Sequence, residues 1–190
     1  MMFKIPSILR ASIISLFCFA FPGAASAQQD DVFLFIPEGG RSLLEATRAS
    51  GLPSDLETDI AKNTGDPGLW KQRLETAKAN SPTLAEFDDW QMQTLAHYLA
   101  VNAPMDPAGD LPWDGRDMAL ERCQSCHIIT VTITQDRTRE AWLGTLNRPS
   151  HIEIELSESE RGALADYLVL NAGIPIDQVP PELRAGGASY

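Results

Sequence analysis

The sequence predicts an all-α protein made of two small helical lobes. Apolar residues recur at helical spacing in several segments of both halves, and helix-capping and helix-ending residues bound these segments. The two halves also share a motif near their ends, because residues 95–103 and 164–172 are identical at six of nine positions. We therefore expect two similar units that are packed from helices.

The first 27 residues have the pattern of a secretory signal peptide. Lys4 and Arg10 precede an apolar run over residues 11–21, and Ala25-Ser26-Ala27 follows after a Pro-Gly break. We expect cleavage after Ala27 and a location in the periplasm or otherwise outside the cytoplasm. The apolar run is shorter than the about 20 residues that span a bilayer, so no stable membrane span is expected.

The expected mature chain is strongly acidic. Removal of Lys4 and Arg10 leaves 13 basic residues against 26 acidic ones, a net charge of −13. Such a surface repels nucleic acid and attracts a partner with a basic docking face, although acidity also keeps an exported protein soluble. The charge therefore argues against nucleic-acid binding and identifies no partner by itself.

Three helices are expected in the first lobe, residues 28–104. Periodic apolar residues predict helices over 41–50, 67–80 and 88–102, the last with acidic residues at its start. Prolines then interrupt the chain, and residues 105–112 are expected to form a linker.

The second lobe, residues 113–177, is expected to hold three more helices. Ser157 and Glu160 have the spacing of a capping box at the start of the last helix. The β-branched run over residues 128–134 is expected to be extended or looped, and residues 178–190 are expected to form a flexible tail. The expected helices cover residues 115–123, 138–146 and 157–171.

The shared motif indicates an internal repeat. Each copy follows a helix that carries a tryptophan, Trp70 in the first half and Trp142 in the second, and a Gly-Arg pair opens a helix in each half, at Gly40 and at Gly115. Alternatively, two unrelated amphipathic helices share Leu, Ala and Tyr on their core faces. The two cysteines of the second half have no counterpart in the first.

Cys123-Gln-Ser-Cys126-His127 has the C-x-x-C-H pattern of covalent haem c attachment. Each thiol adds to one haem vinyl group, and the two-residue gap lets both sulfur atoms reach the porphyrin edge from one turn of helix. His127 follows directly, so its imidazole reaches the iron as an axial ligand. We therefore expect one covalently bound haem c, held by Cys123, Cys126 and His127.

Two other functions of this motif have less support. A zinc site needs further Cys or His ligands, whereas the expected mature chain has no other cysteine and only His97 and His151 besides His127. A redox dithiol normally follows a strand in a βαβ pattern, which the sequence lacks. A dithiol without haem stays open as an alternative.

Four stretches of the second half occur together in a known family: Gly115-Arg116, Cys123-Gln-Ser-Cys126-His127, Arg137-Thr-Arg139-Glu-Ala-Trp142 and Leu164-Ala-Asp-Tyr-Leu168. With them, the segment resembles a small class I c-type cytochrome domain, particularly the monohaem subunits or domains of periplasmic dehydrogenases. The resemblance covers about a third of the chain directly, and the first half only through the repeat. It implies a cytochrome c-like haem domain preceded by a similar helical lobe without a haem motif.

The resemblance also implies roles for three further residues. Arg137, Arg139 or Trp142 is expected to reach the haem propionates. The alternative is that the arginines are exposed and the tryptophan is a core residue.

In this family a methionine beyond the tryptophan typically supplies the sixth iron ligand, but the chain has no methionine after Met118. By position, His151 is the expected sixth ligand, so that His127 and His151 would be the two metal ligands. Met105 in the linker is the alternative sixth ligand. As simpler interpretations, His151 is a solvated loop residue and Met105 packs between the lobes. A His/His iron favours a lower potential than a His/Met iron, and an open sixth position binds small molecules such as carbon monoxide.

The resemblance implies electron transfer, either as a carrier or as the electron-accepting subunit of a periplasmic dehydrogenase, without bond-making catalysis by the chain itself. The expected partners are redox proteins: a dehydrogenase, another cytochrome or an oxidase. The alternative is a haem-based gas-binding sensor or small-ligand enzyme with an open distal site. The first lobe is expected to dock a partner or shield the haem.

Overall fold

The computed structural model describes residues 31–184, and all regular structure in this range is helical, without a strand. The predicted all-α class is therefore confirmed for the part of the chain that is described. The predicted signal peptide, with its cleavage point after Ala27, lies outside the described residues, as does the end of the predicted tail.

The first half, residues 32–104, contains the three predicted helices. They are α1 (Gly40–Ala49), α3 (Pro67–Ala77), continued by the 3-10 turn η2 (Lys78–Asn80), and α5 (Asp89–Asn102). Two shorter helices escaped prediction, because few apolar residues mark them: α2 (Ser54–Lys62) buries Leu56 and Ile60, and the one-turn α4 (Pro82–Glu86) buries Leu84. A 3-10 turn, η1 (Asp31–Phe33), precedes them.

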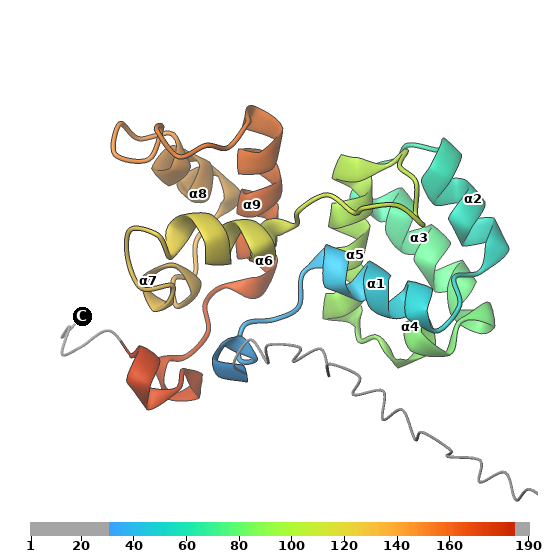
Figure 1. The fold of residues 1–190 in the computed structure, drawn as a ribbon, viewed down its shortest axis with the longest axis horizontal. Helices are drawn as coiled ribbons and strands as arrows, with labels where there is room; N and C mark the ends of the chain where they lie inside the picture. The colour runs from blue at the N-terminus through green and yellow to red at the C-terminus, as the bar shows by residue number, and fades with distance from the viewer. Residues whose placement is uncertain (1–30, 185–190) are drawn as a thin grey trace, which may run out of the picture. The chain divides into compact units, whose positions relative to one another are not determined.

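The second half, residues 113–184, also contains its three predicted helices (Figure 1). The predicted capping box is confirmed, since the Ser157 hydroxyl accepts the Glu160 N–H while the Glu160 carboxylate accepts the Ser157 N–H. These helices are α6 (Gly115–Met118), extended by the π-helical turn η3 (Ala119–Cys123), then α8 (Arg139–Leu146) and α9 (Glu158–Asn171).

The expectation for the β-branched run was wrong, because residues 128–134 contain the helical turn α7 (Thr130–Ile133). The Thr134 hydroxyl donates to the Thr130 carbonyl, and the Thr130 hydroxyl donates to the Leu183 carbonyl at 2.6 Å. Ile129 and Ile133 lie one turn apart and are both buried. Packing and side-chain hydrogen bonds thus outweigh the β preference of these residues.

The described part of the predicted tail contacts the second half. Val179 is buried, and Leu183 accepts the Thr130 bond described above. Two 3-10 turns lie here, η4 (Ile176–Gln178) and η5 (Pro181–Leu183).

Each half has its own apolar core. The first core is formed by α1 to α5, with Trp70 at zero exposure. The second is formed by α6 to α9, and it also includes Ile36 from the segment that precedes α1. Residues 33–36 therefore pack against the second half although they belong to the first in sequence.

The first and last helices of each half cross at a glycine. A Cβ atom on Gly40 of α1 would lie 2.2 Å from the Cβ of Tyr98 on α5. In the second half, a Cβ on Gly115 of α6 would lie 2.1 Å from the Cβ of Tyr167 on α9. Only glycine permits helices to approach this closely, so both glycines of the repeated Gly-Arg pairs serve the same contact.

The two tyrosines link the halves to each other. The Tyr98 hydroxyl donates to the carbonyl of Pro112, three residues before Gly115, at 2.9 Å. The Tyr167 hydroxyl donates to the carbonyl of Pro37, three residues before Gly40, at 2.6 Å. Each half therefore anchors the segment that leads into the other half, and burial raises the pKa of both hydroxyls.

A single carboxylate caps helices of both halves. Asp114 is 4% exposed, and its Oδ1 accepts the Asp117 N–H in the first turn of α6 at 2.9 Å. Its Oδ2 accepts the Arg41 N–H in the first turn of α1 at 2.8 Å. The Arg41 side chain completes the link with two 2.7 Å bonds to the Asp117 carboxylate.

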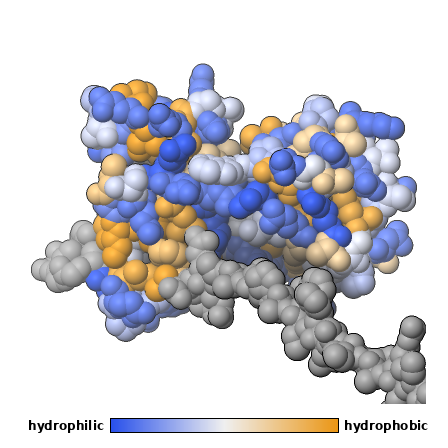
Figure 2. Space-filling view, in the orientation of Figure 1, coloured by the Kyte–Doolittle hydropathy of each residue, from blue (hydrophilic) through white to orange (hydrophobic). Residues whose placement is uncertain are grey.

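The surface of the described residues is mostly hydrophilic, with separate hydrophobic patches on the face drawn in Figure 2. Larger apolar side chains at the surface include Leu34, Trp90 and Ile152. Among the helices within residues 31–184, none combines the length and the hydrophobicity needed to cross a membrane.

Replacement of Asp114 by alanine is expected to lower the free energy of unfolding by about 2 kcal/mol, because two helix N-termini lose their acceptor at about 1 kcal/mol each. Asp66→Ala is the matched control, since exposed Asp66 caps α3 alone, and about 1 kcal/mol is expected there. Urea unfolding followed by circular dichroism measures both variants. Equal losses in the two variants would contradict the shared cap.

Candidate functional site

A π-helical turn presents the C-x-x-C-H motif. Its widened turn η3 is closed by the Gln124 N–H, which donates to the Ala119 carbonyl at 3.4 Å. The N–H groups of Cys126 and His127 then both donate to the Cys123 carbonyl at 3.3 Å. Single π-turns of this kind are frequent at functional sites. The result is a compact turn in which Cys123 is buried, His127 half-buried and Cys126 exposed.

Both cysteines and His127 line one cavity of about 290 Å³ in the second half. Its wall is mainly apolar, with Val131, Leu146, Ile154 and Leu168 among its residues. The predicted haem ligands are thus brought together at a concave, apolar site. Its other lining residues are Arg122, Thr132, Gln135, Arg137, Trp142, Thr145, Ser150 and His151.

The predicted sixth ligand, His151, lines the same cavity although it is 24 residues beyond His127. It lies half-buried in the loop that joins α8 to α9, residues 147–156. Its Nδ1 contacts the Ser150 hydroxyl at 3.1 Å, which leaves Nε2 as the nitrogen for a second interaction. The structure therefore places His127 and His151 at one site.

The alternative ligand, Met105, lies elsewhere. Its backbone N–H donates to the Ile60 carbonyl at 3.0 Å, and its side chain packs against the core of the first half. Met118 and Met92 are buried in the second and the first core respectively. No methionine lines the cavity, so among these side chains only His151 shares it with His127.

Trp142 and Arg137 lie at the cavity, whereas Arg139 does not line it. Trp142 is 3% exposed, and its indole N–H has no hydrogen-bond partner among the described residues. The Arg137 guanidinium lies 5.2 Å from the centre of the Trp142 ring and donates to the Thr145 hydroxyl at 2.8 Å. Two donors are thus available for an anionic group in the cavity.

The Arg139 side chain binds α9 instead of the cavity. Its Nε donates to the Asp166 carboxylate on α9 at 2.6 Å, and its side chain is about half exposed. Of the three side chains predicted for propionate binding, Trp142 and Arg137 line the cavity and Arg139 does not.

Burial raises the pKa of the Cys123 thiol to about 11, although a hydrogen bond from Thr132 opposes this shift. Reactive redox cysteines have lowered pKa values and are partly exposed. Cys123 has neither property, so it is not suited to be the reactive thiol of a redox pair, whereas the exposed Cys126 leaves the dithiol alternative open. Over residues 31–184, no three His, Cys, Asp or Glu side chains gather in a cluster suited to a metal ion.

Sequence reasoning missed Arg161, which supports the loop that carries His151. Arg161 is 5% exposed and extends from α9 to backbone carbonyls of this loop. By the repeat, its position corresponds to Met92, a fully buried core residue. An arginine on the core stripe of an amphipathic helix is the sequence signal that could have identified it.

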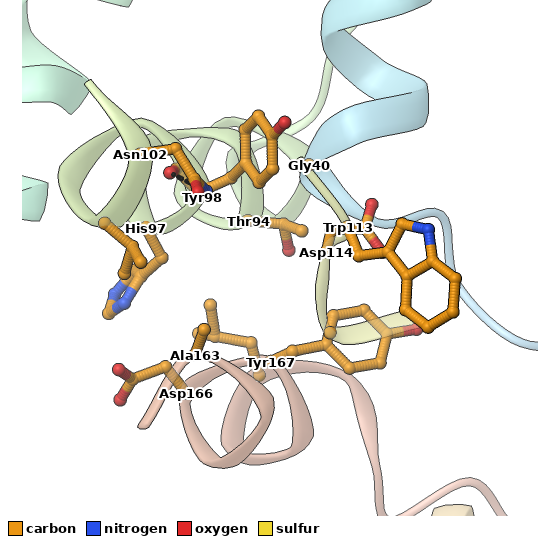
Figure 3. Close-up of a pocket in the computed structure, with 13 residues that line it drawn as sticks. Gly40, Thr94, His97, Tyr98, Asn102, Trp113, Asp114, Ala163, Asp166 and Tyr167 are labelled. Atoms are coloured by element: carbon orange, nitrogen blue, oxygen red, sulfur yellow. Dashed lines mark hydrogen bonds between the residues drawn. The ribbon is translucent and has the colours of Figure 1, made fainter. Parts of the chain in front are cut away.

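A second, smaller cavity lies where α5 meets α9, and Figure 3 shows its lining residues. Its volume is about 30 Å³, the space of one or two water molecules. His97 lines it and faces Asp166, and burial lowers the pKa of this histidine. His97 thus lies at the contact between α5 and α9, and the cavity is too small for a cofactor.

Comparison with protein-family models, with curated proteins and with solved structures found no match for this chain.

In haem-free protein, Cys126 is expected to react with iodoacetamide much faster than Cys123. A pKa of about 11 leaves roughly one Cys123 thiol in a thousand ionised at pH 8, and burial hinders access as well. Between pH 8 and pH 10 the Cys123 thiolate fraction rises about a hundredfold, and its rate should follow. Tandem mass spectrometry of quenched samples resolves the two sites. Equal rates at pH 8 would favour the dithiol function.

Proposed function

We propose that this chain is an exported monohaem c-type cytochrome that transfers electrons. The observation that carries the proposal is the cavity shared by Cys123, Cys126, His127 and His151. Two thiols for thioether bonds and two imidazoles for the iron are the complete set of groups that a six-coordinate haem c needs.

Three properties of the cavity support a haem. Its wall is mainly apolar, which suits a flat, apolar macrocycle. The buried indole N–H of Trp142 lacks a partner in the described structure and would donate to a propionate. The Arg137 guanidinium beside it supplies positive charge for the same group.

When bound, the haem supplies an iron that alternates between the ferric and the ferrous state. His127, from the motif, and His151, from the loop between α8 and α9, are the residues that would hold the iron. The apolar wall excludes water, and the exposed Cys126 leaves one side of the attachment turn open to partners. The chain thereby holds and orients its cofactor without acid or base chemistry.

The proposed partners are redox proteins with a basic docking face. The acidic composition of the expected mature chain, with a net charge of −13, favours such partners and speeds their association at low salt. A dehydrogenase as electron donor follows from the family resemblance, and the periplasm follows from the predicted signal peptide.

A second candidate is a haem protein that binds gases or other small ligands. It is favoured by the loop that carries His151, since residues 147–156 contain no helix and His151 is only half-buried. A ligand residue in such a segment is more easily displaced by an external molecule than one held on a helix.

Expression with export in a host that attaches c-type haem is expected to give a protein that retains one haem on a denaturing gel. Cys123→Ser and Cys126→Ser together should abolish this haem stain, since both thioether bonds are lost. Cys18→Ser is the matched control, because Cys18 lies in the predicted signal peptide, and the stain should persist. An unstained wild-type protein would contradict the proposal.

The reduced wild-type protein is expected to show a low-spin visible spectrum that carbon monoxide leaves unchanged. His151→Ala should convert the spectrum to high spin and allow prompt carbon monoxide binding, because the sixth position opens. His97→Ala is the control, since that imidazole lies at the contact between α5 and α9. A carbonyl shift in the wild type would instead favour the gas-binding function.

A further inference from the structure

We propose that Arg161 is the positioning residue for the sixth iron ligand. It fixes the backbone of the loop over residues 147–156 and thereby holds His151 at the cavity. This inference rests on the proposed haem function and assigns a role to a residue that touches neither the haem ligands' side chains nor the cavity described above.

Arg161 satisfies four carbonyl groups around the loop. Its Nη1 donates to the carbonyl of Leu146 at the end of α8, and to that of His151 itself at 3.3 Å. Its Nη2 donates to the carbonyls of Ile152 at 3.2 Å and Ile154 at 2.7 Å. One planar guanidinium thus fixes the loop on both sides of His151.

The guanidinium of Arg161 is buried, so its charge must be compensated by hydrogen bonds. Arg161 is 5% exposed, and no carboxylate among the described residues forms a salt bridge with it. A buried charge is costly unless it is hydrogen-bonded, so the guanidinium and the carbonyls stabilise each other. If the loop leaves its position, both the charge and the carbonyls lose their partners.

In the first half, a different residue occupies the position of this arginine. The position that corresponds to Arg161 is Met92, which is fully buried in the first core. The segment between α3 and α5 there contains the helical turn α4, which inserts Leu84 into the core. The second half has an irregular loop instead, and it borders a cavity with His151 in its wall. The Met-to-Arg difference therefore accompanies the difference between a filled core and a ligand site.

The test compares haem-loaded, full-length Arg161→Met and Arg161→Lys with the wild type. Arg161→Met copies the residue of the first half and removes all four hydrogen bonds. We expect a partly or fully high-spin spectrum and carbon monoxide binding that is faster by about tenfold or more, the change expected when a buried hydrogen-bonded anchor is lost. Arg161→Lys keeps the charge with fewer donors in a different geometry, so an intermediate rate is expected.

Two further variants separate positioning from general destabilisation. Arg161→Met combined with His151→Ala should bind carbon monoxide no faster than His151→Ala alone, because both changes act through the same ligand. Arg139→Gln is the matched control, since this arginine of the same half binds Asp166 and lies outside the cavity. Its spectrum and carbon monoxide rate should equal those of the wild type.

Wild-type spectra and rates in both Arg161 variants would overturn the inference and leave the proposed function standing. If Arg161→Met fails to accumulate, Arg161→Lys decides alone, and a wild-type rate in that variant overturns the inference. If Arg139→Gln gives the same change as Arg161→Met, the effect is general destabilisation and positioning is refuted. A wild-type protein without covalent haem would refute the proposed function itself, so the two failures are distinguishable.

Discussion

The arrangement of the two halves depends on the hydrogen bonds that the Asp114 carboxylate accepts. It accepts one N–H from the first turn of α1 and one from the first turn of α6, so it fixes the starting points of both halves. The glycine contacts then set how α1 and α6 cross their partner helices. Because the turn η3 follows α6 directly, the position of Cys123 in the second core is determined at the same junction. The helix cap at Asp114 thus helps to position the residues of the cavity.

The two halves share a sequence motif but differ in how they fill their interiors. The first half fills its interior with apolar side chains from five helices, including Leu84 and Met92. In the second half, Arg161 replaces the methionine and an irregular loop replaces α4, while a cavity of about 290 Å³ opens beside the cysteines. Loss of apolar burial and burial of a charge both cost stability. Under the proposed function, a covalently attached haem would fill this cavity and restore apolar contacts.

Local signals in the sequence were sufficient for most helices of the described residues. Capping residues and helical periodicity gave α1, α3, α5, α8 and α9, because these features act within one or two turns. The α7 turn was missed, since its threonines are held by bonds that include one to Leu183, far along the chain. Position in the sequence suggested His151, but the hydrogen bonds of its loop to Arg161 arise only when α9 packs on that loop, so they could not be predicted. Met105 packs in the first half, where its N–H donates to the carbonyl of Ile60, which is distant in the sequence.

The crossed tyrosine bonds have a consequence for how such a chain can evolve. Tyr98 holds the segment before α6, and Tyr167 holds the segment before α1, so each half depends on a hydroxyl supplied by the other. A genetic exchange that cut the chain within residues 105–112 would give each half a foreign neighbour without the matching acceptor. The two halves are therefore expected to be inherited as a pair, and shuffling with other modules to occur outside it. The half without cysteines thereby has a structural role, because it supplies contacts to the other half.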